Sequence, residues 1–180
     1  MYFFRNKTCV PAMLLLCLIC VGFPAQSQTS SAQNAFHTAE GLVSEIYKTV
    51  SFDSTAPKPD WEKVRSMFIG NAVIVLRVTR DSTAVFSVQG FIDDFVKFIE
   101  RSPAKQRGFW ERIVRMKPMV FGDIAHILVL YEAYIPGTPR PPQQGVDSWE
   151  LIKKNGRWWI AAVTNEIPTR ERPIPAELQE

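Results

Sequence analysis

Four strand-like segments follow one another over the second half of the chain, and they constrain its fold more than any other feature. They cover residues 109–121, 124–135, 146–153 and 158–165. The last two are joined by Lys154-Asn155-Gly156-Arg157. Asn-Gly is the strongest short signal for a hairpin, because a type I′ turn needs positive φ at both central residues. Consecutive strands with short turns predict an antiparallel sheet.

Helical periodicity is confined to the part of the chain that precedes these strands. It predicts one helix over residues 38–50, a short second helix that opens at Asp60-Trp61 and ends near Gly70, and a third that starts at Gly90. A short hairpin, residues 72–79 with 84–88, lies between the second and third helices. Helices followed by strands predict an α+β domain, with the helices packed on one face of a curved antiparallel sheet.

The first 27 residues have the pattern of an export signal. Arg5 and Lys7 precede an uninterrupted non-polar run over residues 12–23, and Ala25-Gln26-Ser27 matches the small-x-small pattern of a cleavage site. Such a run is too short to span a bilayer, which takes about 20 residues. We therefore expect cleavage after Ser27 and a secreted or periplasmic protein. The alternative is an N-terminal membrane anchor.

Composition and charge exclude several classes of function for the mature chain. All three cysteines lie in the signal segment, which leaves no disulfide framework, thiol nucleophile or cysteine metal site. Without Arg5 and Lys7, the 21 basic residues fall to 19 against 18 acidic ones, a net charge of +1. Charge-driven binding to nucleic acid is therefore not expected. We expect a flexible lead-in over residues 28–37, one domain over 38–166, and a proline-rich tail over 167–180 that is extended and partly disordered.

The order of these segments resembles the nuclear transport factor 2-like superfamily, which includes SnoaL-like cyclases, ketosteroid isomerases and scytalone dehydratase-like enzymes. The resemblance covers about residues 38–166 and rests on four features taken together. They are Ile46-Tyr47 ahead of Asp60-Trp61, the passage Met67-Phe68-Ile69-Gly70-Asn71-Ala72-Val73, Gly90 before the third helix, and Gly122-Asp123-Ile124-Ala125 with Gly156-Arg157-Trp158-Trp159-Ile160. It implies a cone-shaped α+β barrel whose open end holds an apolar pocket with a few polar groups.

The resemblance also implies two candidate catalytic residues, Tyr47 and Asp147. Ketosteroid isomerase-like sites use a tyrosine on the first helix and a protonated acid on a later strand as hydrogen-bond donors. Asp147 alternates with Trp149 and Leu151, so we expect it to face the cone interior, to stay neutral through burial and to lie within hydrogen-bonding reach of Tyr47. The position of the family's catalytic base is occupied by Leu76. The alternative is that Tyr47 is a core tyrosine and Asp147 caps the proline-rich loop at residues 136–144.

Five further residues are predicted to bind a ligand in the pocket: Trp61, Leu76, Arg112, Tyr131 and Trp149. We place Arg112 on the pocket face of its strand, together with Trp110, Val114 and Met116. No metal site is predicted, because His37 and His126 are isolated from any second ligand at a suitable spacing. No cofactor is predicted either, because the sequence lacks a glycine-rich phosphate loop and the common catalytic motifs.

Two functions remain open from the sequence. The first is an exported domain that binds a small, mainly apolar molecule, either as a binding protein or as a cofactor-free lyase, isomerase or cyclase-like enzyme. The second is a non-catalytic homodimeric binding or interaction module. Trp158 and Trp159 point to opposite faces of one strand, so one of them should lie on the outer face of the sheet, where a second copy could bind.

Overall fold

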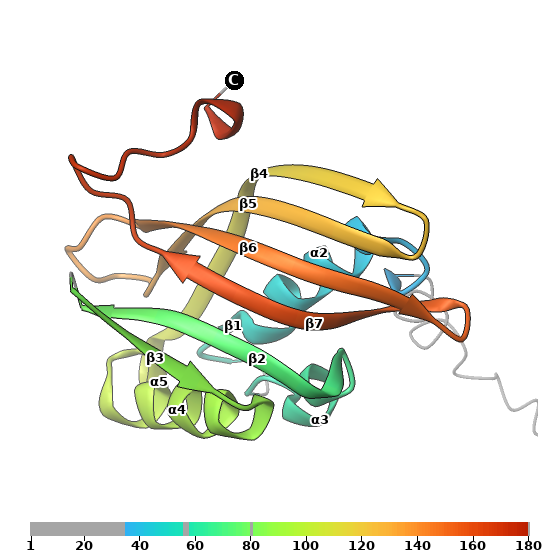
Figure 1. Cartoon of the computed structure of the whole chain (residues 1–180). Helices are drawn as coiled ribbons and strands as arrows, with labels where there is room; N and C mark the ends of the chain where they lie inside the picture. Colours follow the sequence, from blue (N-terminus) through green and yellow to red (C-terminus); the bar gives the residue numbers. More distant parts are fainter. Residues whose placement is uncertain (1–34, 56–57, 80, 180) are drawn as a thin grey trace, which may run out of the picture.

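The computed structural model describes residues 35–55, 58–79 and 81–179 (Figure 1). The predicted signal segment and most of the lead-in lie outside the described residues. The helical elements are α2 (Ala39–Val50), α3 (Trp61–Arg65), α4 (Val88–Arg101), α5 (Ala104–Arg107) and the 3₁₀ turn η1 (Ala176–Leu178). The strands are β1 (Phe52–Asp53), β2 (Phe68–Thr79), β3 (Ser82–Phe86), β4 (Gly108–Phe121), β5 (Ile124–Tyr134), β6 (Gln143–Lys154) and β7 (Arg157–Glu166).

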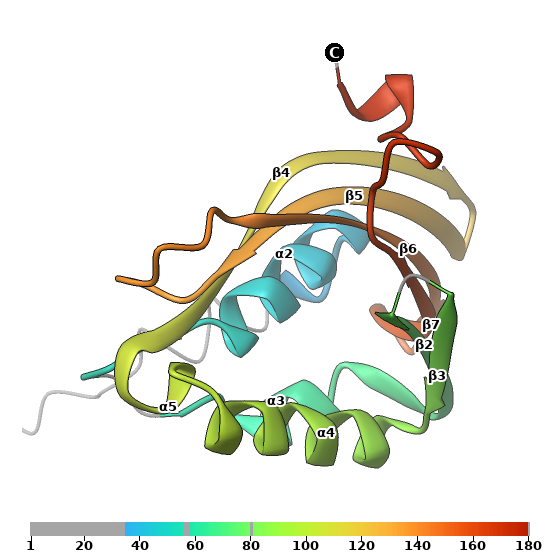
Figure 2. The same ribbon diagram turned by 90° about the vertical axis from the view of Figure 1, so that its left-hand side faces the viewer.

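The seven strands form one curved sheet in the order β1-β4-β5-β6-β7-β2-β3. Its concave face wraps around α2, while α3 and α4 lie across the opening of the cone (Figures 1 and 2). The α+β class and the curved sheet predicted from the sequence are confirmed. The β2–β7 pair is parallel, so the sheet is mixed rather than wholly antiparallel.

Helix α2 supplies the centre of the core. The Thr38 side chain caps it by accepting a hydrogen bond from the Gly41 N–H. Its apolar face, which includes Leu42, Val43 and Ile46, is almost completely buried beneath the sheet. The spacing of those residues is why one face of this helix must lie inward.

The second predicted helix is shorter than expected. Helix α3 ends at Arg65, and Phe68 already belongs to β2, where it pairs with Ile160 of β7. The spacing of Trp61, Val64 and Phe68 predicts one helical face, but Trp61 and Val64 lie in the helix and Phe68 lies in the strand. Short apolar runs do not distinguish the two by periodicity alone.

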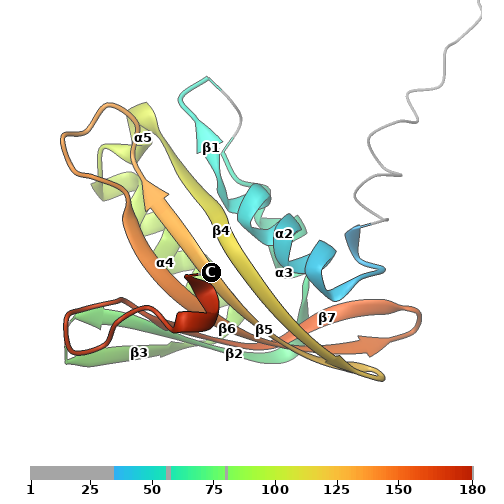
Figure 3. The ribbon, with the colours of Figure 1, turned by 90° about the horizontal axis from the view of Figure 1, so that it is seen from above.

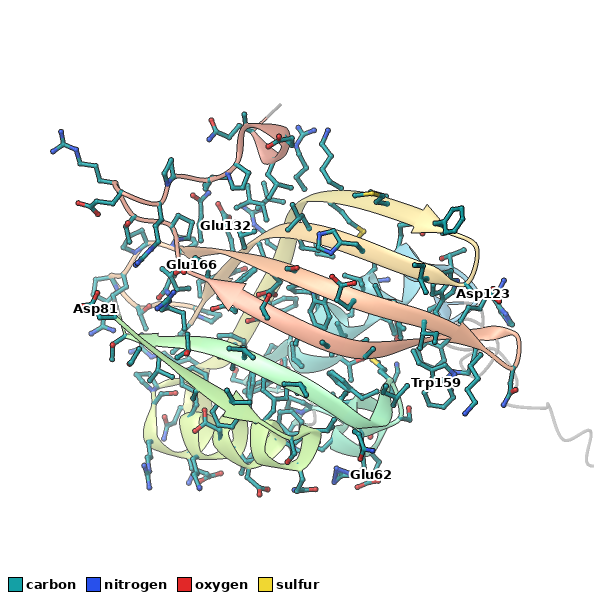
Figure 4. The ribbon with its side chains drawn as sticks, viewed as in Figure 1. Glu62, Asp81, Asp123, Glu132, Trp159 and Glu166 are labelled. Carbon is teal, nitrogen blue, oxygen red and sulfur yellow. The ribbon has the colours of Figure 1, made fainter. Side chains whose placement is uncertain are left out.

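The β6–β7 hairpin is as predicted. Lys154 pairs with Arg157, and the two residues between them have positive φ: 54° at Asn155 and 78° at Gly156. Of the two tryptophans that follow, Trp158 is buried in the core. Trp159 lies on the other face, where its ring packs against the Arg157 guanidinium, 3.9 Å from ring centroid to Cζ. Figure 4 shows Trp159 projecting from β7 near this turn.

Described residues of both flanking segments contact the rest of the domain. In the lead-in, the Phe36 carbonyl accepts a hydrogen bond from the Trp158 N–H, and the Phe36 ring packs on the core. In the tail, Leu178 is 1% exposed, and η1 contacts β4 and β5 on the side of the sheet opposite α2 (Figures 2 and 3). One buried leucine therefore ties the described part of the tail to the sheet.

Candidate functional site

A pocket of about 710 Å³ lies between α2, α4 and the concave face of the sheet. This volume is in the range of sites that hold drug-sized molecules. Its floor consists of buried residues, whereas Pro139, Arg140 and Pro141 of the β5–β6 loop form an exposed rim. The pocket predicted from the family resemblance is therefore present and reaches solvent beside this loop.

Tyr47 and Asp147 meet at the pocket floor. Asp147 faces inward from β6 and is 9% exposed, and Tyr47 reaches it from α2. The Tyr47 hydroxyl donates a hydrogen bond to Asp147 Oδ2, and Trp149 Nε1 donates to the Tyr47 oxygen at 3.3 Å. The predicted position of Asp147 and its contact with Tyr47 are confirmed, and the alternative of a solvent-exposed loop cap is excluded.

Asn165 extends this network to Tyr131. Its Nδ2 donates to Asp147 Oδ1 at 2.8 Å and to the Tyr131 hydroxyl oxygen at 3.0 Å. Asn165 stands directly opposite Asp147 in the β6–β7 register. It was missed in the sequence because Ala161 forms a bulge that changes which residues of β7 face inward. Strict alternation from Trp158 would place Thr164, not Asn165, in the pocket.

The protonation of Asp147 differs from the sequence prediction. Burial raises its pKa to about 6, and the hydrogen bonds from Tyr47 and Asn165 limit the rise. The sequence analysis predicted the upward shift of this pKa. At neutral pH, however, the Asp147 carboxyl group is mostly ionised, and it accepts hydrogen bonds rather than donating one. Burial and the charge of Asp147 raise the pKa of Tyr47 well above its ordinary value, so the phenol keeps its proton.

Glu111 is a second pocket residue that the sequence analysis missed. It lines the pocket from β4, and burial together with the charge of Asp147 raises its pKa to about 8. Its backbone is fixed by Ser51, whose Oγ accepts from the Glu111 N–H at 2.9 Å and donates to the Glu111 carbonyl at 3.1 Å. The alternation of Glu111 with Phe109 and Ile113 was the available signal.

Tyr131 owes its position to a glycine on the neighbouring strand. It stands opposite Gly145 in the β5–β6 register, and its ring lies across that residue. A Cβ atom at Gly145 would overlap the Tyr131 hydroxyl group. The absence of a side chain at Gly145 therefore lets the phenol reach Asn165.

The remaining ligand-binding candidates divide into two groups. Leu76 and Trp149 line the pocket with Tyr131, as predicted. Trp61 does not line it, because α3 lies against α4 and the indole packs on Phe95 at 5.5 Å between ring centroids. Arg112 does not line it either: it faces outward and pairs with Glu132 on the outer surface.

Arg112 was misplaced because of a second bulge. The extra residue Val114 in β4 brings Ile113 and Met116 to the inner face, so Met116 does not share a face with Arg112. His126 is also on the outer face, where its Nδ1 lies 2.7 Å from Glu150 Oε1. Among the described residues, no cluster of His, Cys, Asp or Glu side chains is arranged to bind a metal ion.

The two basic residues that line the cavity, Arg77 and Arg140, lie at its rim. Arg77 of β2 is paired with Glu166 of β7, with its Nε 2.9 Å from Oε1, and Arg140 lies in the exposed loop. Figure 4 shows Glu166 at the end of β7 remote from Trp159. The floor, by contrast, carries the two acidic groups Glu111 and Asp147. In the described part of the chain, no helix has the length and hydrophobicity needed to cross a membrane.

Solved structures with the same fold are numerous, although no protein-family model and no curated protein matches the sequence. A nuclear transport factor 2-like protein of unknown function from Pseudomonas putida superposes with a TM-score of 0.58 at 8% identity, over 83% of this chain and 95% of that one. A protein named as a candidate scytalone dehydratase, from Novosphingobium aromaticivorans, gives 0.55 at 12% identity, over 78% and 89%.

Nuclear transport factor 2 of Cryptosporidium parvum gives a TM-score of 0.51 at 12% identity, over 72% of this chain and 90% of that one. The chain therefore has the nuclear transport factor 2-like fold, as the segment order indicated. This fold is found in proteins with different names and activities, so function must be argued from the pocket itself.

Proposed function

We propose that this protein is an exported protein that binds a small, mainly apolar molecule in the cone. The observation that carries the proposal is the hydrogen-bonded floor of Tyr47, Asp147, Asn165 and Tyr131 at the base of an otherwise largely apolar pocket. Apolar walls supply affinity by burying ligand surface, and a few fixed polar groups orient the ligand.

Tyr131 is the group best placed to contact the ligand directly. Its oxygen accepts a hydrogen bond from Asn165, and no acceptor among the described residues takes its hydroxyl proton. Burial raises the pKa of Tyr131, so the proton stays on the phenol. Tyr131 can therefore donate to a carbonyl or hydroxyl oxygen of the ligand.

The same floor supports a catalytic form of the proposal, a cofactor-free lyase, isomerase or cyclase-like enzyme. Asp147, with a pKa of about 6, would accept a proton at neutral pH, while the Tyr131 hydroxyl would stabilise negative charge that develops on an oxygen. Leu76 occupies the position of the family's catalytic base. The proposed chemistry would therefore proceed without a base at that position.

The alternative function, a homodimeric interaction module, is favoured by the tip of the β4–β5 hairpin. Phe121 is 82% exposed there, Met119 68% and Ile124 58%. An exposed apolar patch of this kind is typical of a protein-binding surface. If a second copy covers it, sedimentation at micromolar concentration should give about twice the monomer mass, and Phe121→Ser should restore the monomer.

Native mass spectrometry of the protein purified from its own cells tests the proposed function. We expect a co-purifying molecule with the wild type and with Val73→Trp, because Val73 is 44% exposed on β2. Leu76→Trp, three residues further along the same strand, should lose that molecule because the indole fills the pocket. Equal retention of the ligand by both variants would place it outside the pocket and contradict the proposal.

A further inference from the structure

Glu111 differs from the other polar groups at the pocket floor in having no partner for its side chain. Tyr47, Asp147, Asn165 and Tyr131 are joined by hydrogen bonds, whereas no donor among the described residues reaches the Glu111 carboxyl group. Its main chain is nevertheless fixed by the two hydrogen bonds with Ser51. A rigid backbone thus presents a free carboxyl group to the cavity.

A free carboxylate in such a place is costly. Withdrawing a carboxylate from water without a compensating cation is unfavourable, so a partly buried carboxyl group of this kind takes up a proton or meets a positive charge. The ionised Asp147 nearby increases this cost and is one reason why the pKa of Glu111 is raised. Glu111 meets this requirement with a proton when no cation is beside it, and a cationic ligand would replace that proton.

Among the residues that the structure describes, none supplies a positive charge to the Glu111 carboxyl group. Of the basic residues that line the cavity, Arg77 pairs with Glu166 and Arg140 lies in the exposed rim loop. The further charged group lining the pocket is Asp94 of α4, which is also acidic. The cavity lining therefore holds three acidic residues, and of its two basic residues Arg77 is already paired.

Aromatic rings line the same cavity as Glu111. Phe95 and Phe98 of α4 pack edge to face with Phe109 of β4, with ring centroids 5.3 and 5.4 Å from that of Phe109. All three line the cavity, as does Tyr134. Aromatic faces attract organic cations as well as apolar groups, and this attraction strengthens when the cation is removed from water.

We propose that the pocket takes an apolar molecule carrying a basic amine, with the ammonium group placed against Glu111 and the apolar part against the phenylalanines of α4 and β4. This inference rests on the proposed small-molecule function and specifies its ligand class. The Tyr131 hydroxyl remains available for an oxygen atom of the same ligand.

Three probes with one ring system and different charges test the proposal: 2-naphthylmethylamine, 2-naphthylmethanol and 2-naphthoate. Calorimetric titration at pH 7 should show the amine binding about tenfold or more tightly than the alcohol, with the carboxylate weakest. Glu111→Gln should abolish the advantage of the amine and leave the affinity for the alcohol within about twofold. Glu132→Gln, which removes a carboxylate on the outer face of the sheet, should keep the wild-type order.

Proton release provides a measurement that needs no variant. At pH 7 the amine should displace about one proton from Glu111, which calorimetry in buffers of different ionisation enthalpy detects, and the alcohol should displace none. If the alcohol binds as tightly as the amine, or if amine binding releases no proton, the ligand class is wrong while pocket binding stands. If none of the three probes binds, the proposed function fails together with this inference.

Discussion

The hydroxyl of Tyr47 and the Oδ2 atom of Asp147 are joined by a buried hydrogen bond, although 100 residues separate them in the sequence. One residue comes from the helix at the centre of the cone and the other from the strand that curves over it. The hydrogen bond therefore ties the helix to the sheet at the point where the pocket is deepest, and it stabilises both the fold and the charge on Asp147.

Removing the Tyr47 hydroxyl should change the titration of Asp147. In Tyr47→Phe, Asp147 loses a hydrogen bond that lowers its pKa, so the pKa should rise above its value of about 6 in the wild type. Trp149 Nε1 also loses its acceptor, and the free energy of unfolding should fall by about 1–2 kcal/mol. Side-chain carboxyl NMR and urea titration measure the two effects. Tyr134→Phe is the control at the rim, and an unchanged Asp147 titration in Tyr47→Phe would contradict the account.

The stability of the protein should fall as the pH rises toward 8. The folded-state pKa of Glu111 is about 8, against an ordinary value of 4.5, so the folded state binds more protons than the unfolded state between these values. The stability that Glu111 contributes is complete below about pH 4.5 and is lost as the pH passes through 8. Asp147 acts in the same direction between its ordinary value of 3.8 and about 6.

Glu111→Gln should remove the larger part of this pH dependence. Because Glu111 is only partly buried and water in the pocket reduces the effect, we expect the variant to be about 1–3 kcal/mol more stable than the wild type at pH 8, with little difference at pH 4.5. Urea denaturation across this range measures it. If the wild type instead gains stability relative to Glu111→Gln between pH 5 and pH 8, the predicted sign of this pH dependence is wrong.

A methyl group at Gly145 should displace Tyr131. The new Cβ would overlap the Tyr131 hydroxyl, and the pairing of Gly145 with Tyr131 in the β5–β6 ladder opposes an easy shift. Gly145→Ala should therefore cost about 1–3 kcal/mol of unfolding free energy and weaken ligand binding. Gly70→Ala is the matched control, since a Cβ there would have no neighbour within 4 Å. Equal stability of the two variants would mean that the position of the Tyr131 ring does not depend on the missing side chain at Gly145.

Export predicts the N-terminus of the mature protein. Arg5, Lys7 and the Ala25-Gln26-Ser27 site lead us to expect that N-terminal sequencing of protein from its own cells begins near Gln28. The expected fraction is the periplasm or the medium. Recovery of the chain with Met1 intact in the cytosolic fraction would refute this prediction.

The sequence predicted the class of fold and the positions of Tyr47 and Asp147 at the pocket floor. The reasons lie in the regular patterns around these two residues. Asp147, Trp149 and Leu151 alternate without interruption in β6, so their shared inner face could be read directly. Tyr47 lies on the apolar face of a regular helix. Where periodicity continues through an element, sequence alone assigns the face.

Bulges explain why Asn165 was missed at the pocket floor and why Arg112 was wrongly placed in the pocket. Val114 in β4 and Ala161 in β7 each shift the alternation by one residue, so that Asn165 turns inward and Arg112 was grouped with the wrong neighbours. The partner strand determines where such a residue is inserted, and the local sequence carries little sign of it. The pKa of Glu111 likewise depends on the position of Asp147, which the fold brings about.

Locating a bound neutral probe tests the central claim most directly, because the pocket and the β4–β5 tip are both apolar. We propose titrating the isotopically labelled protein with 2-naphthylmethanol and following backbone and side-chain NMR signals. The account predicts shifts of the Trp149 indole N–H and the Asn165 side-chain amide, and loss of both effects in Asp147→Leu. Shifts confined to Met119, Phe121 and Ile124 would show that the protein binds apolar molecules at its hairpin tip and would contradict a function of the pocket.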